Sequence, residues 1–295
     1  MNTAGRRIET RTSMTAQWTC LSRAVSSVER NPCYRCDDYV ARRLVPGFFA
    51  IPGIGKLFIR LLAARGAYEW VIARTKYIDA VMKDCLSNAF TQVVILGAGF
   101  DTRALRFQAE AQKATFYELD AAVTQEAKIG QYKNRHLPLP SNLLFIPIDF
   151  DKESPGLKLE QAGFQRNART LFLLEGVLQY LQPHSVDQNF KLICELSGAG
   201  SQVVFDCIYA SVLRRENRYY GERGFSRQVS GEGEQWHFGI EEGELEHFVS
   251  THGCRLLDYK DATALEEMYF KDAAGKIVGR VNGTHFLATA LVIKA

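Results

Sequence analysis

The chain has 295 residues, of which 46% are hydrophobic and 23% charged, and its formal net charge is +3. This composition is typical of a folded protein with a substantial core, and the net charge is too small to indicate nucleic acid or an anionic membrane as an obligatory partner. No apolar run approaches the roughly 20 residues that a membrane-spanning helix needs. Seven cysteines, an odd number, do not form a disulfide framework, so we expect a reducing, cytoplasmic setting.

The N-terminal part of the chain is predicted to be helical after a polar tail. Residues 1–12 contain three arginines and faintly resemble an organelle transit peptide, but we expect a disordered tail there. Apolar residues recur at helical spacing after Thr15, which suits an N-cap, and Pro32 ends that helix. Further helices are predicted after Asp38, around residues 57–62 and across residues 67–85, with a loop from Pro46 to Gly55.

Cys33 and Cys36 form a single CxxC motif between the first two predicted helices. A metal or redox site would be expected to add a second cysteine pair, or a His pair at zinc spacing, and the sequence has neither. We therefore predict incidental thiols near a turn and no metal site.

Arg74 lies on the apolar stripe of the predicted helix at 67–85, one turn from Trp70 and from Tyr77. A buried guanidinium requires a partner. One interpretation is an internal salt bridge, for instance with Glu175. The other is that Arg74 binds the carboxylate of an amino-acid-like ligand, to which its planar fork is suited.

The centre of the chain alternates strands with helices, which predicts a doubly wound α/β fold with a mostly parallel sheet. The predicted strands are at about 92–96, 115–119, 143–148, 169–174 and 201–207, and the predicted helices at 103–111, 121–135 and 185–197.

The first of these strands runs into a glycine turn, Gly97-Ala98-Gly99, that opens a helix. Such a turn lets backbone N–H groups and a helix N-terminus approach a nucleotide-like ligand. Taken alone it suggests a dinucleotide site, but the third glycine of the dinucleotide fingerprint is replaced by Thr102. This departure favours S-adenosylmethionine (SAM) over NAD.

Acidic residues follow the other strands, where a parallel sheet places its ligands. Asp120 ends the second strand about 20 positions after the turn, at the spacing of a carboxylate that binds ribose hydroxyls, with Glu118 as the second choice. Asp149 and Phe150 follow the third strand and suit the edge and the face of an adenine. Glu175 follows the fourth.

The segment 208–252 concentrates aromatic residues beside arginines and is predicted to be an inserted lid over a flat substrate. Tyr209 and His237 are the candidates for a catalytic base, although His237 can equally be a structural residue of the lid. A plain packed cap is the alternative. Single-stranded nucleic acid is disfavoured, because glutamates nearly balance the arginines there.

Taken together, several motifs resemble the leucine carboxyl methyltransferase family, and most closely its bacterial branch of small-molecule, polyketide-associated O-methyltransferases. The motifs are Thr15–Trp18, Ser22–Ala24, Arg74–Asp79, Leu96–Arg103, Glu118–Asp120 and Leu174–Leu181. The resemblance implies a class I SAM-dependent methyltransferase fold with seven strands, the last antiparallel, and a helical cap. We expect a single domain with four parts: a helical cap at 13–88, a SAM-binding core at 89–207, the lid at 208–252 and C-terminal strands at 253–295.

The resemblance also implies roles for individual residues. Arg74 would bind the methionine carboxylate and Glu175 the methionyl amine, with Arg23 near the methionine or substrate carboxylate. Gly97 and Gly99 would contact the methionine and ribose, and Asp120 would bind the ribose. Asp149 and Phe150 would contact the adenine.

The sequence thus predicts an O-methyltransferase that acts on a carboxylate or hydroxyl of a small metabolite. A carboxylate acceptor is already ionised at neutral pH and needs no base, whereas a phenol or alcohol needs one. Two alternatives remain: a methyltransferase for protein C-terminal carboxylates, and a non-catalytic SAM-binding protein. The sequence does not indicate the oligomeric state.

Overall fold

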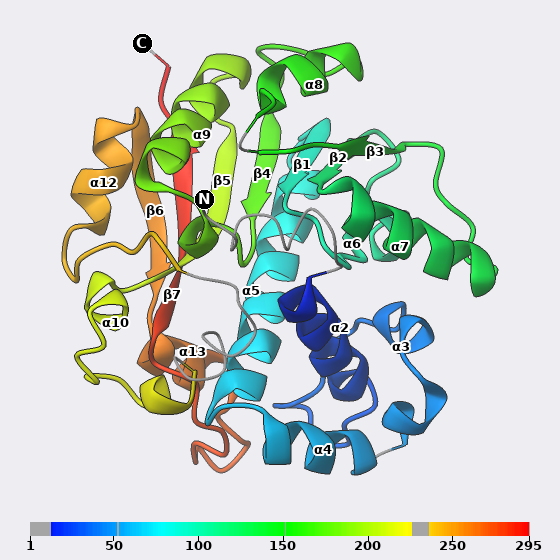
Figure 1. The fold of residues 1–295 in the computed structure, drawn as a ribbon, viewed down its shortest axis with the longest axis vertical. Coiled ribbons are helices and arrows are strands. Elements are labelled where there is room, and N and C mark those ends of the chain that lie inside the picture. Colours follow the sequence, from blue (N-terminus) through cyan, green and yellow to red (C-terminus); the bar gives the residue numbers. More distant parts are fainter. Residues whose placement is uncertain (1–12, 52, 151, 226–235, 295) are drawn as a thin grey trace, which may run out of the picture.

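The computed structural model describes residues 13–51, 53–150, 152–225 and 236–294, so the predicted tail at 1–12 lies outside it. A seven-stranded sheet forms its centre, in the order β3-β2-β1-β4-β5-β7-β6 (Figure 1). The strands are β1 (Gln92–Leu96), β2 (Thr115–Asp120), β3 (Leu143–Pro147), β4 (Thr170–Leu174), β5 (Gln202–Ile208), β6 (Cys254–Lys260) and β7 (His285–Val292).

The direction of the strands confirms the predicted fold. Neighbours from β3 to β5 pair in parallel, whereas β7, the last strand, runs antiparallel to both β5 and β6. The strand order reverses between β1 and β4, and this reversal opens a crevice at the carboxyl ends of the strands. Both strands are buried along their whole length, as expected for continuous apolar runs in the middle of a parallel sheet.

Helices cover both faces of the sheet. They are α2 (Met14–Ser26), α3 (Ala41–Leu44), α4 (Ile54–Leu62), α5 (Ala67–Ser87), α6 (Arg103–Arg106), α7 (Ala122–Asn134), α8 (Pro155–Gln161), α9 (Pro183–Leu196), α10 (Ala210–Leu213), α12 (Leu245–Thr251) and α13 (Ala262–Tyr269), with short 3₁₀ helices η1 (Gly47–Ala50) and η2 (Leu178–Tyr180). In Figure 1, α2, α3 and α4 gather beside one end of the long α5, below the carboxyl ends of the central strands.

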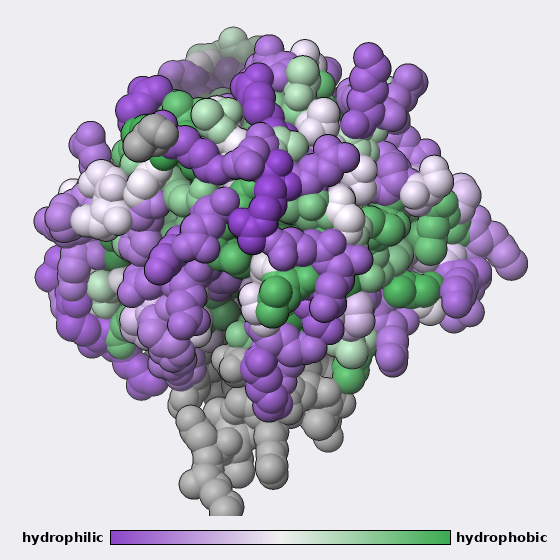
Figure 2. Space-filling model, turned by 90° about the horizontal axis from the view of Figure 1, so that it is seen from above, coloured by the Kyte–Doolittle hydropathy of each residue, from purple (hydrophilic) through white to green (hydrophobic). Residues whose placement is uncertain are grey.

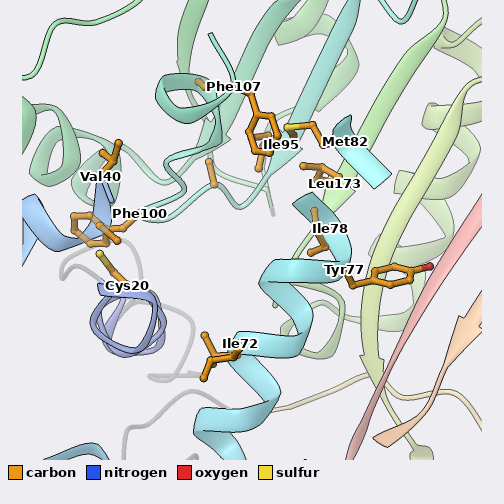
Figure 3. Close-up of a cluster of buried hydrophobic side chains, with 14 of the residues drawn as sticks. Cys20, Val40, Ile72, Tyr77, Ile78, Met82, Ile95, Phe100, Phe107 and Leu173 are labelled. Carbon is orange, nitrogen blue, oxygen red and sulfur yellow. The ribbon is translucent and has the colours of Figure 1, made fainter. Parts of the chain in front are cut away.

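Two hydrophobic clusters form the core, one on each face of the sheet. In the first, Ile78 and Met82 of α5 contact the strand residues Ile95 and Leu173 (Figure 3). Val94, the neighbour of Ile95, belongs to the second cluster, because successive side chains of a strand point to opposite faces. Helix α5 is thereby held rigidly against the sheet, and the site described below depends on that position.

Several helix ends differ from the prediction. The N-cap of α2 is Ser13, whose hydroxyl accepts a hydrogen bond from the amide of Ala16 at 3.2 Å, and not Thr15. The helix ends at Ser26, well before Pro32. The Ser26 hydroxyl donates to the carbonyl of Tyr34, so the following segment folds back onto the helix. The predicted loop at 46–55 contains η1 and the start of α4.

The segment predicted as a lid is described over residues 208–225 and 236–252. It contains α10 and α12, and α12 packs on β6. Within the described ranges, no helix is both long and apolar enough to cross a membrane. The face shown in Figure 2 is mostly hydrophilic, with hydrophobic residues in separate areas.

Candidate functional site

A cavity of about 710 Å³ opens at the carboxyl ends of the central strands, where the strand order reverses. Its size lies in the range of ligand pockets for small molecules. Eight residues that the sequence predicted to bind the cofactor line it together: Arg23, Arg74, Gly97, Gly99, Asp120, Asp149, Phe150 and Glu175. His237 lines the cavity as well.

The glycine turn after β1 forms the floor of the cavity. Gly97 and Gly99 both have positive φ, at 66° and 49°. A Cβ atom on Gly97 would lie 2.5 Å from Cγ2 of Val177, and one on Gly99 would lie 3.1 Å from Cβ of Ala16. Only glycine fits the first position, because backbone conformation and space both exclude a side chain. The contact with Ala16 shows that α2 lies directly over the turn.

Asp120 connects β2 to this turn. Its carboxylate accepts hydrogen bonds from the backbone N–H of Gly99 and, at 2.6 Å, from that of Ala121. Burial raises the pKa of Asp120, although these two N–H groups act in the opposite direction. Glu118, the second choice in the sequence, is buried against Lys128 at 2.5 Å and does not line the cavity. Asp120 is therefore the carboxylate of β2 that faces it.

Arg74 reaches the cavity wall from α5 and is ion-paired there. Its Nη1 lies 2.8 Å from Oδ2 of Asp206, and its Nε lies 3.0 Å from Oε1 of Glu175. The salt bridge with Glu175 that one interpretation expected is thus present. Yet neither Nε nor Oε1 has a hydrogen-bond partner among the described residues, because the alignment of the two atoms is poor.

Glu175 lies between two arginines. Besides Arg74, it contacts Arg103, whose Nη1 donates to Oε2 at 2.6 Å. Burial alone would raise the pKa of Glu175, but the guanidinium groups of Arg103, Arg74 and Arg23 outweigh it and lower the pKa to about 2. Glu175 is therefore ionised at neutral pH and offers a negative charge at the cavity wall.

Arg103 and Asp206 are part of this site, and the sequence analysis missed both. Arg103 also pairs with Asp79 at 2.8 Å and with Asp101, and it is almost completely buried. Asp206 is a carboxylate inside the apolar strand β5, and its backbone partner is the N–H of Gly176 at 2.5 Å. A charge within an otherwise apolar strand was the available signal for Asp206. For Arg103 the only available signal was its place after the glycine turn.

Arg23 attaches α2 to the glycine turn. Its Nε donates to Asp38 at 2.8 Å, and its Nη2 donates to the carbonyl oxygen of Phe100 at 2.6 Å. Asp38 also accepts from the hydroxyl of Thr102, the residue that replaces the third glycine. The N-terminal helix is thereby fixed to the turn by buried polar contacts.

Asp149 and Phe150 form the far end of the cavity, after β3. Lys152 donates to Oδ2 of Asp149 at 2.6 Å, and Glu153 accepts from its backbone N–H at 2.9 Å. An acidic residue beside an aromatic one thus lines the cavity after β3, the edge strand, away from the arginine pairs beside β4 and β5.

The structure does not bring Tyr209 to this cavity. Its side chain is buried in the second hydrophobic cluster, and its hydroxyl lies 2.6 Å from that of Tyr259. Burial and the hydrogen bond to Tyr259 raise its pKa well above the ordinary value. His237 does line the cavity, and its backbone N–H donates to the carbonyl of Gln179 at 2.7 Å.

Among the described residues, no group of three His, Cys, Asp or Glu side chains could hold a metal ion. Cys33 and Cys36 are both free thiols, with Cys36 buried and donating to the carbonyl of Arg23.

The strand order, the glycine turn after β1 and the acidic residues at the following strand ends are those of the class I methyltransferases. The family model of the leucine carboxyl methyltransferases matches residues 16–194, more than half of the chain, and the chain belongs to this family. The predictions of fold and family are thus confirmed.

Two curated relatives carry the same name, "Putative S-adenosyl-L-methionine-dependent methyltransferase". The one from Bacillus subtilis, YktD, is 27% identical over 204 residues, which are 68% of this chain and 66% of the relative. One from Mycobacterium avium is 36% identical over 149 residues, 49% of this chain and 45% of the relative. These matches span less than two thirds of either relative.

A solved structure with the same fold is described as a putative methyltransferase from Thermobifida fusca. It superimposes with a TM-score of 0.62 over 98% of both chains, at 14% identity. SAM is the cofactor of the class to which the chain belongs, as predicted from the turn. The cavity fits it, because Arg74 Nε and Glu175 Oε1 are buried polar atoms without hydrogen-bond partners. The carboxylate of a methionyl group is an acceptor for the first atom, and its ammonium is a donor to the second.

Proposed function

We propose that this protein is an O-methyltransferase that transfers a methyl group from SAM to a carboxylate or hydroxyl oxygen of a small metabolite. One observation carries the proposal: residues from six separate segments, each predicted to bind part of SAM, line a single cavity at the point where the sheet reverses its strand order. The small-molecule branch of the family, often associated with secondary metabolism, is the one whose motifs the chain resembles.

The charges at the two ends of the cavity suit the two ends of SAM. Arg74 would bind the methionine carboxylate, and Glu175 the methionyl amine. Asp120 would exchange its hydrogen bond from the Gly99 N–H for the ribose hydroxyls, while Asp149 and Phe150 would contact the adenine edge and face. Arg23 would hold α2 over the turn and so keep the methionine end closed.

When bound, SAM supplies a methyl group on a positively charged sulfur. The protein has to align the acceptor oxygen with that group and keep water away. Helix α2 serves both demands, because it lies over the turn and lines the cavity with Thr15 and Thr19. His237 is the catalytic candidate from the sequence that lies within reach of this space. We place the reaction in the cytoplasm, since all seven cysteines are free thiols.

A labelling experiment tests the proposal. The protein is incubated with methyl-labelled SAM and an extract of its host, and small molecules and proteins are then separated. We expect label in a small molecule that is heavier by one methyl group. Label in the protein fraction would instead indicate methylation of a protein C-terminal carboxylate, and no label in either fraction would indicate a non-catalytic SAM-binding protein.

The same sample distinguishes the two acceptor groups. A methyl ester releases labelled methanol in mild alkali, whereas a methyl ether keeps its label. The control is Gly97→Ala, in which the added Cβ would clash with Val177 and strain the turn that lines the cavity, and it should abolish labelling in both fractions.

A further inference from the structure

A second, smaller recess of about 80 Å³ adjoins the main cavity between α2, α5 and β7. The two share five lining residues: Thr15, Thr19, Arg74, Gly176 and Tyr180. Aromatic rings surround the recess. Trp70, Phe225 and Trp236 each lie between 5.0 and 5.6 Å from the ring of His285, measured between centroids.

His285 is held in one tautomer by a chain of hydrogen bonds. The side-chain amide of Asn282 donates to the carbonyl of Arg65 at 2.9 Å, which turns its Oδ1 toward Thr284. The Thr284 hydroxyl donates to that Oδ1 at 2.5 Å. Its oxygen therefore accepts from Nδ1 of His285, 2.7 Å away, and this leaves Nε2 without a proton.

The lone pair of Nε2 has no hydrogen-bond partner among the described residues, although His285 is 2% exposed and lines the recess. Burial, together with the nearby charge of Arg74, lowers the pKa of His285 to about 3, so the ring is neutral at pH 7. A neutral ring with one free lone pair is a hydrogen-bond acceptor. Its natural partner is a group that carries a hydrogen.

We propose that this recess binds the hydroxyl end of the methyl acceptor and that Nε2 of His285 accepts its hydrogen. The inference rests on the function proposed above and deepens it, because it favours a hydroxyl over a carboxylate. A carboxylate has no hydrogen for Nε2 at neutral pH, and it would lose its hydration among aromatic rings. Arg74 is the one cation among the described residues that line the recess, and the function proposed above assigns it to the methionine carboxylate.

The recess is smaller than the roughly 150 Å³ cavity that holds a benzene molecule. It therefore accepts one end of the acceptor, while the rest extends into the main cavity. In the transfer, the oxygen–methyl bond forms as the methyl–sulfur bond breaks and leaves its electron pair on sulfur. The acceptor hydroxyl keeps its hydrogen bond to Nε2 as its oxygen attacks, and its proton is released to solvent, because the low pKa of His285 keeps the ring neutral. His285 would be the catalytic residue and Thr284 a positioning residue.

Intrinsic fluorescence reports directly on this recess, because the chain has three tryptophans and all of them border it. Trp18 and Trp70 line it, and the ring of Trp236 contacts that of His285. The protein, saturated with S-adenosylhomocysteine, is titrated with phenol and in parallel with benzoate, with excitation where neither absorbs. We expect phenol to bind about tenfold more tightly than benzoate, the equivalent of one buried hydrogen bond.

Variants separate the hydrogen bond from the shape of the recess. His285→Phe should remove the preference for phenol. Thr284→Val keeps the ring but frees its tautomer and should weaken phenol binding, whereas Thr284→Ser, which keeps the hydroxyl, should restore it. His247→Gln, at an exposed histidine of α12, is the control and should bind phenol as the wild type does.

Calorimetry of S-adenosylhomocysteine binding on the same samples distinguishes the two proposals. Binding that is equal in the wild type and all variants supports the assignment of His285 to the acceptor. If the cofactor product binds but benzoate binds as tightly as phenol, or His285→Phe keeps the preference, the inference about the recess is wrong. If the wild type does not bind S-adenosylhomocysteine, the proposed function is wrong, and the inference with it.

Discussion

Arg74 illustrates how one side chain can stabilise a fold and bind a ligand. Its two carboxylate partners balance the cost of burying a guanidinium, so the residue is stable without a ligand. Its Nε, however, is left without a well-aligned acceptor at the cavity wall. The two interpretations of Arg74 that the sequence left open are therefore compatible with each other.

Removal of Arg74 should weaken cofactor binding. We expect Arg74→Ala to reduce the affinity for SAM by about 2–4 kcal/mol, because a desolvated carboxylate of the ligand would lose a charge-assisted pair. Arg74→Lys should recover only part of this, since a point charge cannot replace the fork. The measurement is calorimetric titration of folded variants. Unchanged affinity in Arg74→Ala would leave Arg74 with a structural role alone.

The neutral ring of His285 should make the protein sensitive to acid. The unfolded chain takes up a proton at the ordinary pKa of about 6.5, whereas the native ring stays neutral down to about pH 3. The unfolded state therefore binds more protons in this window, and the free energy of unfolding falls as pH falls, by up to about 1.4 kcal/mol per pH unit.

Urea unfolding of wild type and His285→Phe between pH 6.5 and 5 measures this contribution. We expect a flatter dependence on pH in His285→Phe, while the exposed control His247→Gln should follow the wild type. Identical slopes in wild type and His285→Phe would show that the ring is not held neutral in the native state.

Tyr209, a catalytic candidate from the sequence, lies outside the cavity. We therefore expect Tyr209→Phe to leave kcat within about tenfold on the acceptor identified by labelling, below the roughly 10²–10⁴-fold loss typical of a missing general base. Its main effect should be a small loss of stability, since Tyr259 loses its hydrogen-bond partner. A hundredfold loss of kcat with normal SAM affinity would return Tyr209 to the catalytic site.

At the scale of elements, the turn after β1 and the segment after β4 fit together closely. Gly97 has a positive φ and no room for a Cβ beside Val177. We expect Gly97→Ala to lower the free energy of unfolding by about 1–3 kcal/mol, from backbone strain and crowding together. Adding Val177→Ala to the Gly97→Ala variant should relieve the crowding between the two side chains but not the backbone strain. Urea unfolding of the single and double variants checks this, and full recovery in the double variant would contradict a strained backbone.

The sequence predicted the strands well because each is a short apolar run between turn signals. The strand-end residues Asp120, Asp149 and Glu175 could be predicted for the same reason, since the parallel sheet fixes where they lie. The limits of α2 were less predictable. Its end is determined by the Ser26 hydroxyl, which donates to a carbonyl eight residues further along the chain, and no local pattern contains that contact.

The partners of the site residues could not be predicted from local patterns either. Arg74 and Asp206 are 132 positions apart, and Arg103 and Glu175 are 72 apart. His285 looks like an ordinary residue at the start of a strand, and only the packing of Trp70 and Phe225 around it shows that it borders the site. Long-range pairs of this kind depend on how the strands are arranged in the sheet. The sequence predicts the class of fold, but not which distant side chains meet within it.

At the scale of the whole molecule, elements from both ends of the chain close the site. Helix α2 lies over the glycine turn, α5 delivers Arg74, and β7 delivers His285 next to it (Figure 1). The central strands supply the cofactor residues between these two ends. The N-terminal helices are thus part of the candidate site as well as a cap on the fold.

The central claim is that the cavity binds SAM, and titration calorimetry of the wild-type protein tests it most directly. SAM and S-adenosylhomocysteine should each bind at one site per chain and raise the melting temperature, because a ligand that binds only the native state stabilises it. NAD, measured under the same conditions, should do neither. Binding of NAD without binding of SAM would contradict the account, beginning with the interpretation of Thr102 in the glycine turn.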